Sequence, residues 1–248
     1  MTTDFVFIHG GGQGSWVWEQ TISAMGQQSS GKPGRSLALD VPGCGDKRER
    51  DTSEIGFEEI VDELISDIEV SSLKNVILVG HSQAGTLLPR MAERRPDLFR
   101  RLVFISCLTP FPGSTVLDMM GNGMRGQNDA EVGWPIDPAV FSREERRHAM
   151  FCNDMTPAEA DWFLGLLGAD AWPKSSYGVN DWRYDHLAGM PTSYVVLLQD
   201  RSLPVPWQER FAELVQADRV VSIDAGHQAM NTRPQALAEV LLAEASIP

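Results

Sequence analysis

The chain has 248 residues, of which 42% are hydrophobic and 22% charged, an ordinary globular composition with enough length for a sizeable core. Its net charge of −13, with no lysine or arginine cluster, argues against a nucleic-acid partner and disfavours strongly anionic substrates. Three distant cysteines without a CxxC pair favour a reducing compartment and predict no metal site. There is neither a signal-peptide pattern nor an apolar run approaching about 18 residues, so we expect a cytoplasmic protein without membrane contact.

Short apolar runs alternate with helical segments along the chain, which predicts a mostly parallel sheet covered by helices on both faces. The predicted strands span residues 5–8, 36–40, 76–80, 102–106, 193–199 and 219–224. The predicted helices span residues 16–27, 56–70, 84–94 and 234–245. The whole chain is therefore expected to form one α/β domain.

Residues 111–190 interrupt this alternation because they contain no clear strand. The segment has helical patterns near 141–152 and 157–167 and a glycine-rich stretch. It also holds four of the seven tryptophans: Trp134, Trp162, Trp172 and Trp182. We interpret it as a helical cap inserted into a core formed by residues 1–110 and 191–248. The alternative is an irregular helical layer that only completes the core.

The stretch "VILVGHSQAG" joins a buried strand to an amphipathic helix through a sharp turn that carries Ser82. This arrangement is typical of a nucleophile elbow, whose strained turn needs small neighbours, here Gly80 and Ala84. The start of the next helix offers unpaired N–H groups that suit a developing negative charge. The alternative interpretation is a structural turn with an idle serine.

A serine hydroxyl needs a base, and five histidines are present. His81 adjoins Ser82, but consecutive side chains on this turn point apart. His227 follows the last strand, and the carboxyl ends of parallel strands share one edge, so we expect it beside Ser82. Asp200 ends the preceding strand at that edge and is predicted to orient the imidazole. Asp224 is the rival, although it lies only three residues before His227.

The loop "HGGGQG" after the first strand is expected to complete an oxyanion hole. One donor would be the backbone N–H of Gln83, and the other that of Gly11, with Gly12 in reserve. Glycine allows a close approach of the backbone to a substrate. A phosphate cradle is the alternative, but the loop matches neither GxGxxG nor a P-loop.

Six stretches together resemble the α/β-hydrolase superfamily. They are similar to the branch that holds methyl-salicylate-type esterases, hydroxynitrile lyases and small bacterial carboxylesterases. The stretches are "FVFIHGGGQGSWVW", "LALDVPGCG", "VILVGHSQAG", "LVFISCLTPFPG", "LLQDRSLPVPWQ" and "DAGHQAM". The cap matches only loosely. The resemblance implies a Ser82, Asp200 and His227 triad, an oxyanion hole at Gly11 and Gln83, and neither a metal nor an organic cofactor.

Two positions separate the chemistries of this branch. Its hydroxynitrile lyases carry a lysine directly after the catalytic histidine and a threonine in the first loop. The corresponding residues here are Gln228 and Gly10. Without the lysine, a leaving cyanide has no cationic partner, which favours ester hydrolysis.

We therefore predict a serine hydrolase that cleaves small neutral, apolar or aromatic carboxylic esters through an acyl-enzyme. The expected pocket under the cap includes Gly10, Gly12, Gln228, Trp134 and Trp162. Lactone hydrolysis, thioester hydrolysis or acyl transfer by the same triad is the first alternative. A lyase, a cofactor-free oxygenase or a non-catalytic ligand receptor is the second. The expected partner is a small ester, and a homodimer is left open.

Overall fold

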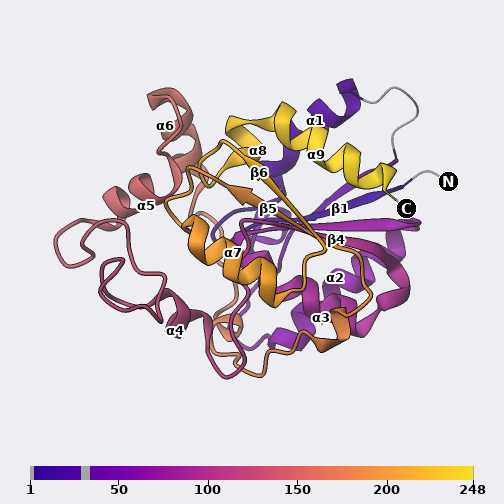
Figure 1. The fold of residues 1–248 in the computed structure, drawn as a ribbon, viewed down its shortest axis with the longest axis horizontal. Helices are drawn as coiled ribbons and strands as arrows, with labels where there is room; N and C mark the ends of the chain where they lie inside the picture. Colours follow the sequence, from indigo (N-terminus) through magenta and orange to yellow (C-terminus); the bar gives the residue numbers. More distant parts are fainter. Residues whose placement is uncertain (1–2, 29–33, 248) are drawn as a thin grey trace.

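The computed structural model describes residues 3–28 and 34–247, and these form a six-stranded sheet (Figure 1). Every neighbouring pair of strands is parallel, in the order β2-β1-β3-β4-β5-β6. The strands are β1 (Phe5–Ile8), β2 (Ser36–Leu39), β3 (Val76–His81), β4 (Phe99–Ile105), β5 (Thr192–Leu197) and β6 (Arg219–Ile223). All six strands were expected from the sequence, and their carboxyl ends share one edge of the sheet.

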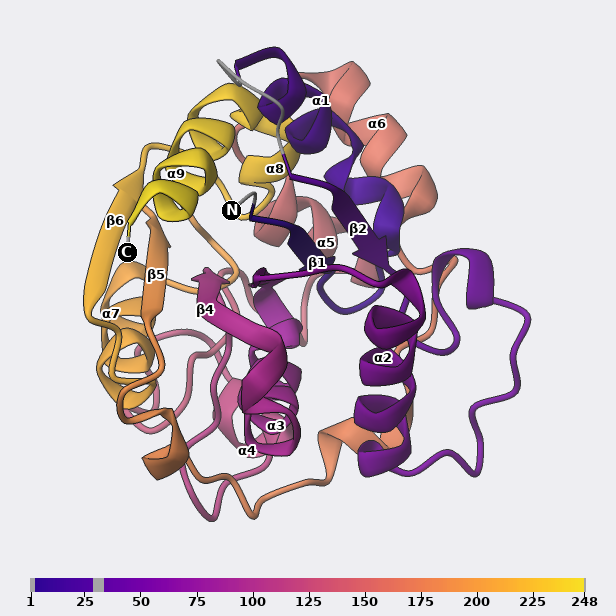
Figure 2. The same ribbon diagram turned by 90° about the vertical axis from the view of Figure 1, so that its right-hand side faces the viewer.

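Helices cover both faces of the sheet (Figures 1 and 2). One face is covered by α1 (Glu19–Gln28), α8 (Ala229–Thr232) and α9 (Pro234–Ser246). The other is covered by α2 (Phe57–Ser71), α3 (Leu87–Arg94) and α7 (Val205–Leu214). The α/β architecture predicted from the sequence is confirmed.

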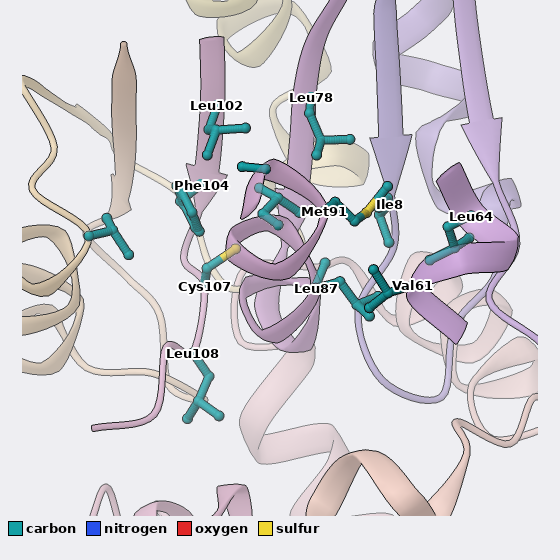
Figure 3. Packing of buried hydrophobic residues seen from close by; sticks show 14 of the residues in the cluster. Ile8, Val61, Leu64, Leu78, Leu87, Met91, Leu102, Phe104, Cys107 and Leu108 are labelled. Carbon is teal, nitrogen blue, oxygen red and sulfur yellow. The ribbon is translucent and has the colours of Figure 1, made fainter. Parts of the chain in front are cut away.

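The sheet separates two apolar clusters because successive side chains of a strand point to opposite faces. Ile8 and Leu78 belong to the cluster under α2 and α3, where Figure 3 shows them near Val61 and Met91. The neighbouring residue Ile77 lies in the cluster under α1 and α9. All six residues of β3 are buried, as a central strand covered on both faces requires.

Several elements differ from the sequence-based expectation. The helix expected over residues 16–27 begins with a 3₁₀ turn at Ser15–Trp18, and α1 starts only at Glu19. The helix expected over residues 84–94 begins with a tight 3₁₀ turn at Ser82–Thr86, and α3 starts only at Leu87. The sharp reversal after β3 explains the tighter winding. No helix was expected over α7, whose start contains two prolines, Pro204 and Pro206. Proline is tolerated in the first turn of a helix, where its missing N–H has no intrahelical role.

The segment between β4 and β5 contains three α-helices and no strand, and all of its residues are described. The helices are α4 (Val116–Met120), α5 (Arg143–Phe151) and α6 (Pro157–Leu166), which lie at one end of the molecule (Figure 1). Further along this segment, Trp182 packs edge-on against Phe57 of α2 with ring centroids 5.6 Å apart. Trp172 and Trp182 belong to the main apolar cluster. Part of the segment thus completes the core, while other parts of it wall the cavities beside the sheet edge.

None of the helices in the described part of the chain is both long and apolar enough to span a bilayer.

Candidate active site

Ser82 lies at the turn between β3 and the following 3₁₀ turn, with a left-handed φ of 54°. Residues other than glycine rarely adopt this backbone conformation, so the surrounding structure must hold Ser82 in it. A Cβ on Gly80 would lie 2.5 Å from Leu88 Cδ1, and one on Gly85 would overlap the carbonyl of Leu108. A side chain at position 85 would therefore meet backbone, whereas one at position 80 would require Leu88 to move.

Three side chains from separate loops form one hydrogen-bonded chain. His227 Nε2 lies 3.0 Å from Ser82 Oγ, and His227 Nδ1 lies 2.6 Å from Asp200 Oδ2. Only 1% of His227 and 7% of Asp200 is exposed. With the Nδ1 proton donated to the carboxylate, Nε2 is free to accept the serine proton. The structure thus brings together the three residues that the sequence selected.

Further donors hold the Asp200 carboxylate. The Ser106 hydroxyl donates to Oδ2 at 2.6 Å, and the backbone N–H groups of Ser202 and Leu203 donate to Oδ1 at 2.7 and 2.8 Å. Hydrogen bonds to ionised groups are the stronger ones, so these donors both fix and stabilise the carboxylate. The rival Asp224 is exposed and accepts a bond from Gln199 at 2.9 Å, away from the imidazole.

Two further histidines support the site without joining the hydrogen-bonded chain. His81 Nε2 donates to the backbone carbonyl of His227 at 2.9 Å, a contact that the sequence analysis missed. His9 Nδ1 donates to the Gly10 carbonyl at 2.8 Å, and its Nε2 accepts from the Val41 N–H at 3.1 Å. Burial lowers the pKa of His81 well below its usual range, and nearby His227 adds to the shift. Burial also lowers the pKa of His9, although the Gly10 carbonyl opposes this.

The glycine loop lies beside the serine. Gly11 lines the same cavity as Ser82 and Gln83, and a Cβ on Gly11 would overlap Gln83 Oε1. The Gly11 N–H has no hydrogen-bond acceptor among the residues that the structure describes. The N–H of Gly168, in the segment between β4 and β5, donates to the Gly12 carbonyl at 2.9 Å and fixes the loop. A backbone donor thus remains available beside the serine.

Two adjoining cavities lie at this edge of the sheet. The inner chamber, of about 180 Å³, is bounded by Ser82 and His227 together with largely apolar side chains. These apolar residues are Leu108, Val116, Met120, Met150, Phe151 and Leu203. The outer chamber, of about 510 Å³, is larger. Of these two chambers, the inner one is lined by both the serine and the histidine.

The residues expected to form the pocket do not all reach a chamber. Gly12 and Trp134 line the outer chamber. Trp162 lines neither cavity; it is 45% exposed and packs edge-on against Trp16 outside them. Gly10 is also outside the lining, because its Cα faces His81 and Ser82.

Gln228 was also expected to line the pocket, and this expectation is wrong. The residue is fully buried, and neither its side-chain oxygen nor its nitrogen has a hydrogen-bond partner among the described residues. It lines neither chamber. The side chain after His227 therefore does not face the cavity in which a leaving group would depart.

No cluster of three or more His, Cys, Asp or Glu side chains within residues 3–28 and 34–247 is arranged to hold a metal ion.

The sequence matches the profile of the alpha/beta hydrolase family over residues 5–240. The chain belongs to this family, as the fold and the hydrogen-bonded serine, histidine and aspartate suggest. The crystal structure of a pyrethroid hydrolase from Sphingobium faniae is similar, with a TM-score of 0.77 and 22% identity. That match covers 100% of this chain and 99% of the other, and it supports the shared fold.

Two similar proteins are esterases. A carbendazim-hydrolysing esterase of Nocardioides sp. is 25% identical over 97% of this chain and 98% of its own length. Methylesterase 1 of Arabidopsis thaliana is 25% identical over 96% of this chain and 94% of its own. These relatives confirm the branch that the sequence resembles and the predicted class of enzyme, a carboxylic ester hydrolase.

Proposed function

We propose that this hydrolase cleaves small carboxylic esters with Ser82 as nucleophile, His227 as general acid and base, and Asp200 as the carboxylate that orients the histidine. The observation that carries the proposal is the continuous hydrogen-bonded chain from Asp200 through His227 to Ser82 in the wall of a cavity. A hydroxyl, a base and an orienting carboxylate at hydrogen-bond distance are the parts that acyl transfer requires.

In the acylation half, His227 Nε2 takes the proton as Ser82 Oγ attacks the ester carbonyl carbon. The negative charge develops on the carbonyl oxygen, which the N–H groups of Gly11 and Gln83 stabilise. Asp200 stabilises the imidazolium that forms. His227 then gives its proton to the departing alcohol oxygen, the C–O bond breaks, and an acyl-serine remains.

In the deacylation half, His227 takes a proton from water as the water oxygen adds to the acyl carbon. The same backbone donors stabilise the second tetrahedral oxyanion. Breakage of the bond to Ser82 Oγ releases a carboxylic acid, and His227 returns the proton to the serine. The overall change consumes one ester and one water and yields one acid and one alcohol.

The lining of the inner chamber favours a substrate whose reacting end is neutral and apolar or aromatic. Its walls are mainly aliphatic, aromatic and thioether side chains, and its volume of about 180 Å³ suits a small acyl or alkoxy group. The methylesterase and carbendazim-esterase relatives support small esters as the substrate class.

Hydrolysis is favoured over cyanide release by the same lining. Apart from His227, no basic side chain lines the inner chamber within the part of the chain described here. A leaving cyanide would therefore depart without a dedicated cation. An alcohol needs only the proton that His227 carries.

The test combines turnover with covalent labelling. We expect the purified protein to hydrolyse p-nitrophenyl butyrate and to react with a fluorophosphonate at Ser82, located by peptide mass spectrometry. Ser82→Ala should lose the labelling and almost all hydrolysis. Full hydrolysis by Ser82→Ala would contradict the proposal.

A further inference from the structure

The outer chamber continues from the reaction site. Five residues line both cavities: Gly11, Gln83, Met150, Phe151 and Tyr177. The Tyr177 hydroxyl donates to Gln83 Oε1 at 3.1 Å, so two polar side chains lie at the boundary. An extended molecule with its ester at Ser82 would pass this boundary and place its other end in the outer chamber.

One face of α5 supplies three arginines to that chamber. Arg143, Arg146 and Arg147 line the cavity, and Met150 and Phe151 continue the same face toward the serine. Spacings of three and four residues place side chains on one side of a helix. The intervening acids do not line the cavity. Of these, Glu145 accepts a bond from the N–H of Ser142 at 2.8 Å and caps the helix.

These three arginines lack carboxylate partners in a strongly acidic chain. The net charge is −13, yet none of the three forms a salt bridge with any Asp or Glu among the described residues. Asp170 is the one carboxylate in the lining within the described chain. It is already engaged by Arg48 Nε at 2.7 Å and by the N–H of Gly45 at 3.1 Å. The cations of the chamber therefore remain available to a ligand.

Two of the guanidinium groups are held in place by neighbouring structure. Arg146 stacks over the Trp134 ring at 5.1 Å from its centroid, and its buried Nε has no partner in the described residues. Arg147 lies against Gly168, where a Cβ would overlap its Nη2. Gly168 in turn donates to the Gly12 carbonyl at 2.9 Å. Arg147 is thus fixed beside the glycine loop.

No carboxylate among the described residues compensates the charge of Arg147, whose Nη1 donates to the Leu167 carbonyl at 3.4 Å. Burial lowers its pKa, and the positive charge of Arg143 adds to this effect. A bound anion would offset both contributions, because it supplies an opposite charge and hydrogen-bond acceptors where water is partly excluded. Helix α5 therefore presents a cationic surface to the outer chamber.

We propose that the outer chamber binds a carboxylate at the remote end of the ester substrate, with Arg146 and Arg147 as the specificity-determining residues. The preferred substrates would be half-esters of dicarboxylic acids, a substrate class that rests on the proposed function of Ser82. The planar fork of arginine matches a carboxylate in a bidentate geometry. Asp170 and the acidic chain disfavour a dianion such as phosphate. This proposal departs from the expectation, based on net charge alone, that anionic substrates are disfavoured.

The turnover test uses matched esters and matched variants. Monomethyl terephthalate and monomethyl suberate differ in length, and each is paired with its dimethyl ester as the neutral analogue. We expect the ratio of kcat/KM for half-ester over diester to fall roughly ten- to a hundredfold in R146Q/R147Q, since charge-assisted hydrogen bonds are lost. Arg210→Gln is the control, because Arg210 also stacks on a tryptophan, Trp207 at 4.1 Å, outside both chambers.

A binding test separates this proposal from that of the triad. Calorimetry measures monomethyl terephthalate binding to Ser82→Ala, with and without R146Q/R147Q. If R146Q/R147Q weakens the binding of the half-ester by the same roughly ten- to hundredfold, the anion site is supported. This holds even if neither the half-ester nor the diester is hydrolysed by the protein with Ser82 intact, a result that would contradict the proposed function alone. Hydrolysis with an unaltered half-ester ratio, or binding that does not depend on the two arginines, overturns the anion site and leaves the triad standing.

Discussion

The two chambers differ in how their charged groups are satisfied. In the inner chamber, His227 is bonded to Asp200 at 2.6 Å, and that carboxylate has three further protein donors. In the outer chamber, Arg146 and Arg147 have no carboxylate partner among the described residues. A charged group with an oppositely charged partner inside the protein keeps one position, whereas an arginine without a carboxylate partner can still bind an anionic ligand. Changes around the inner chamber should therefore slow all esters, and changes in the outer chamber should alter the choice between esters.

The largest effect is expected from Asp200→Asn. The amide can no longer favour the Nδ1–H tautomer or stabilise the imidazolium of His227, so kcat should fall roughly 10³- to 10⁴-fold for charged and neutral esters alike. Asp224→Asn is the matched control, since Asp224 is exposed and bonded to Gln199. Steady-state kinetics with p-nitrophenyl butyrate checks both variants. Equal losses in the two would show that Asp200 has no special role.

A smaller loss is expected when only one support of that carboxylate is removed. Ser106→Ala deletes the hydroxyl that donates to Asp200 at 2.6 Å, while the two backbone donors remain. A hydrogen bond to a charged group contributes about 1.5–3 kcal/mol, and only the part that strengthens as the imidazolium forms acts on the rate, so we expect kcat to fall by up to about tenfold.

The matched control for this loss lies near the opposite ends of the strands. The Ser193 hydroxyl donates to the buried Glu244 carboxylate at 2.7 Å, away from both chambers. Ser193→Ala should reduce the free energy of unfolding without lowering kcat. If both serine variants reduced kcat to the same extent, the effect of Ser106 would be on stability alone.

The buried His81 should make the free energy of unfolding depend on pH. Burial lowers its pKa in the folded protein, so below about pH 6.5 the unfolded chain binds the additional proton. The neutral, buried His81 therefore contributes to the free energy of unfolding above about pH 6.5, and this contribution is lost as the pH falls. In His81→Gln, whose amide N–H can still donate to the His227 carbonyl, the acid dependence of the free energy of unfolding should decrease by up to about 1.4 kcal/mol per pH unit.

Urea titrations between pH 5 and 8 measure this dependence. His9 is also buried with a lowered pKa, so some acid dependence should remain in His81→Gln. An unaltered slope in His81→Gln would mean that His81 titrates as it does in the unfolded chain.

The candidate site was predictable because strong local signals are combined with one topological rule. Ser82, Asp200 and His227 each follow a strand of clear apolar pattern, and parallel strands bring those positions to one edge. The choice of Asp200 over Asp224 required only the geometry of a strand end. The observed distances of 3.0 and 2.6 Å agree with that reasoning.

The chambers were harder to predict because the packing of the segment between β4 and β5 decides which side chains face them. The spacing of Arg143, Arg146 and Arg147 is visible in the sequence, but the side of α5 that faces the cavity depends on tertiary packing. Likewise, Trp134 and Trp162 lie in the same segment, yet only Trp134 lines a chamber. Residue type alone could not separate the two.

These two tryptophans provide the finest test of the outer chamber. Trp134→Ala removes the ring under the Arg146 guanidinium, and a cation–π contact contributes about 0.5–1 kcal/mol where it is exposed to water. We expect the preference for a half-ester over its diester to fall a few-fold, mainly through KM, because the guanidinium is less well oriented. Trp162→Ala removes an equally large ring outside both chambers and should leave the preference unchanged. If Trp162→Ala reduced the preference as much as Trp134→Ala, the effect would come from general loosening of the cap, and the stacking of Arg146 would have no part in selection.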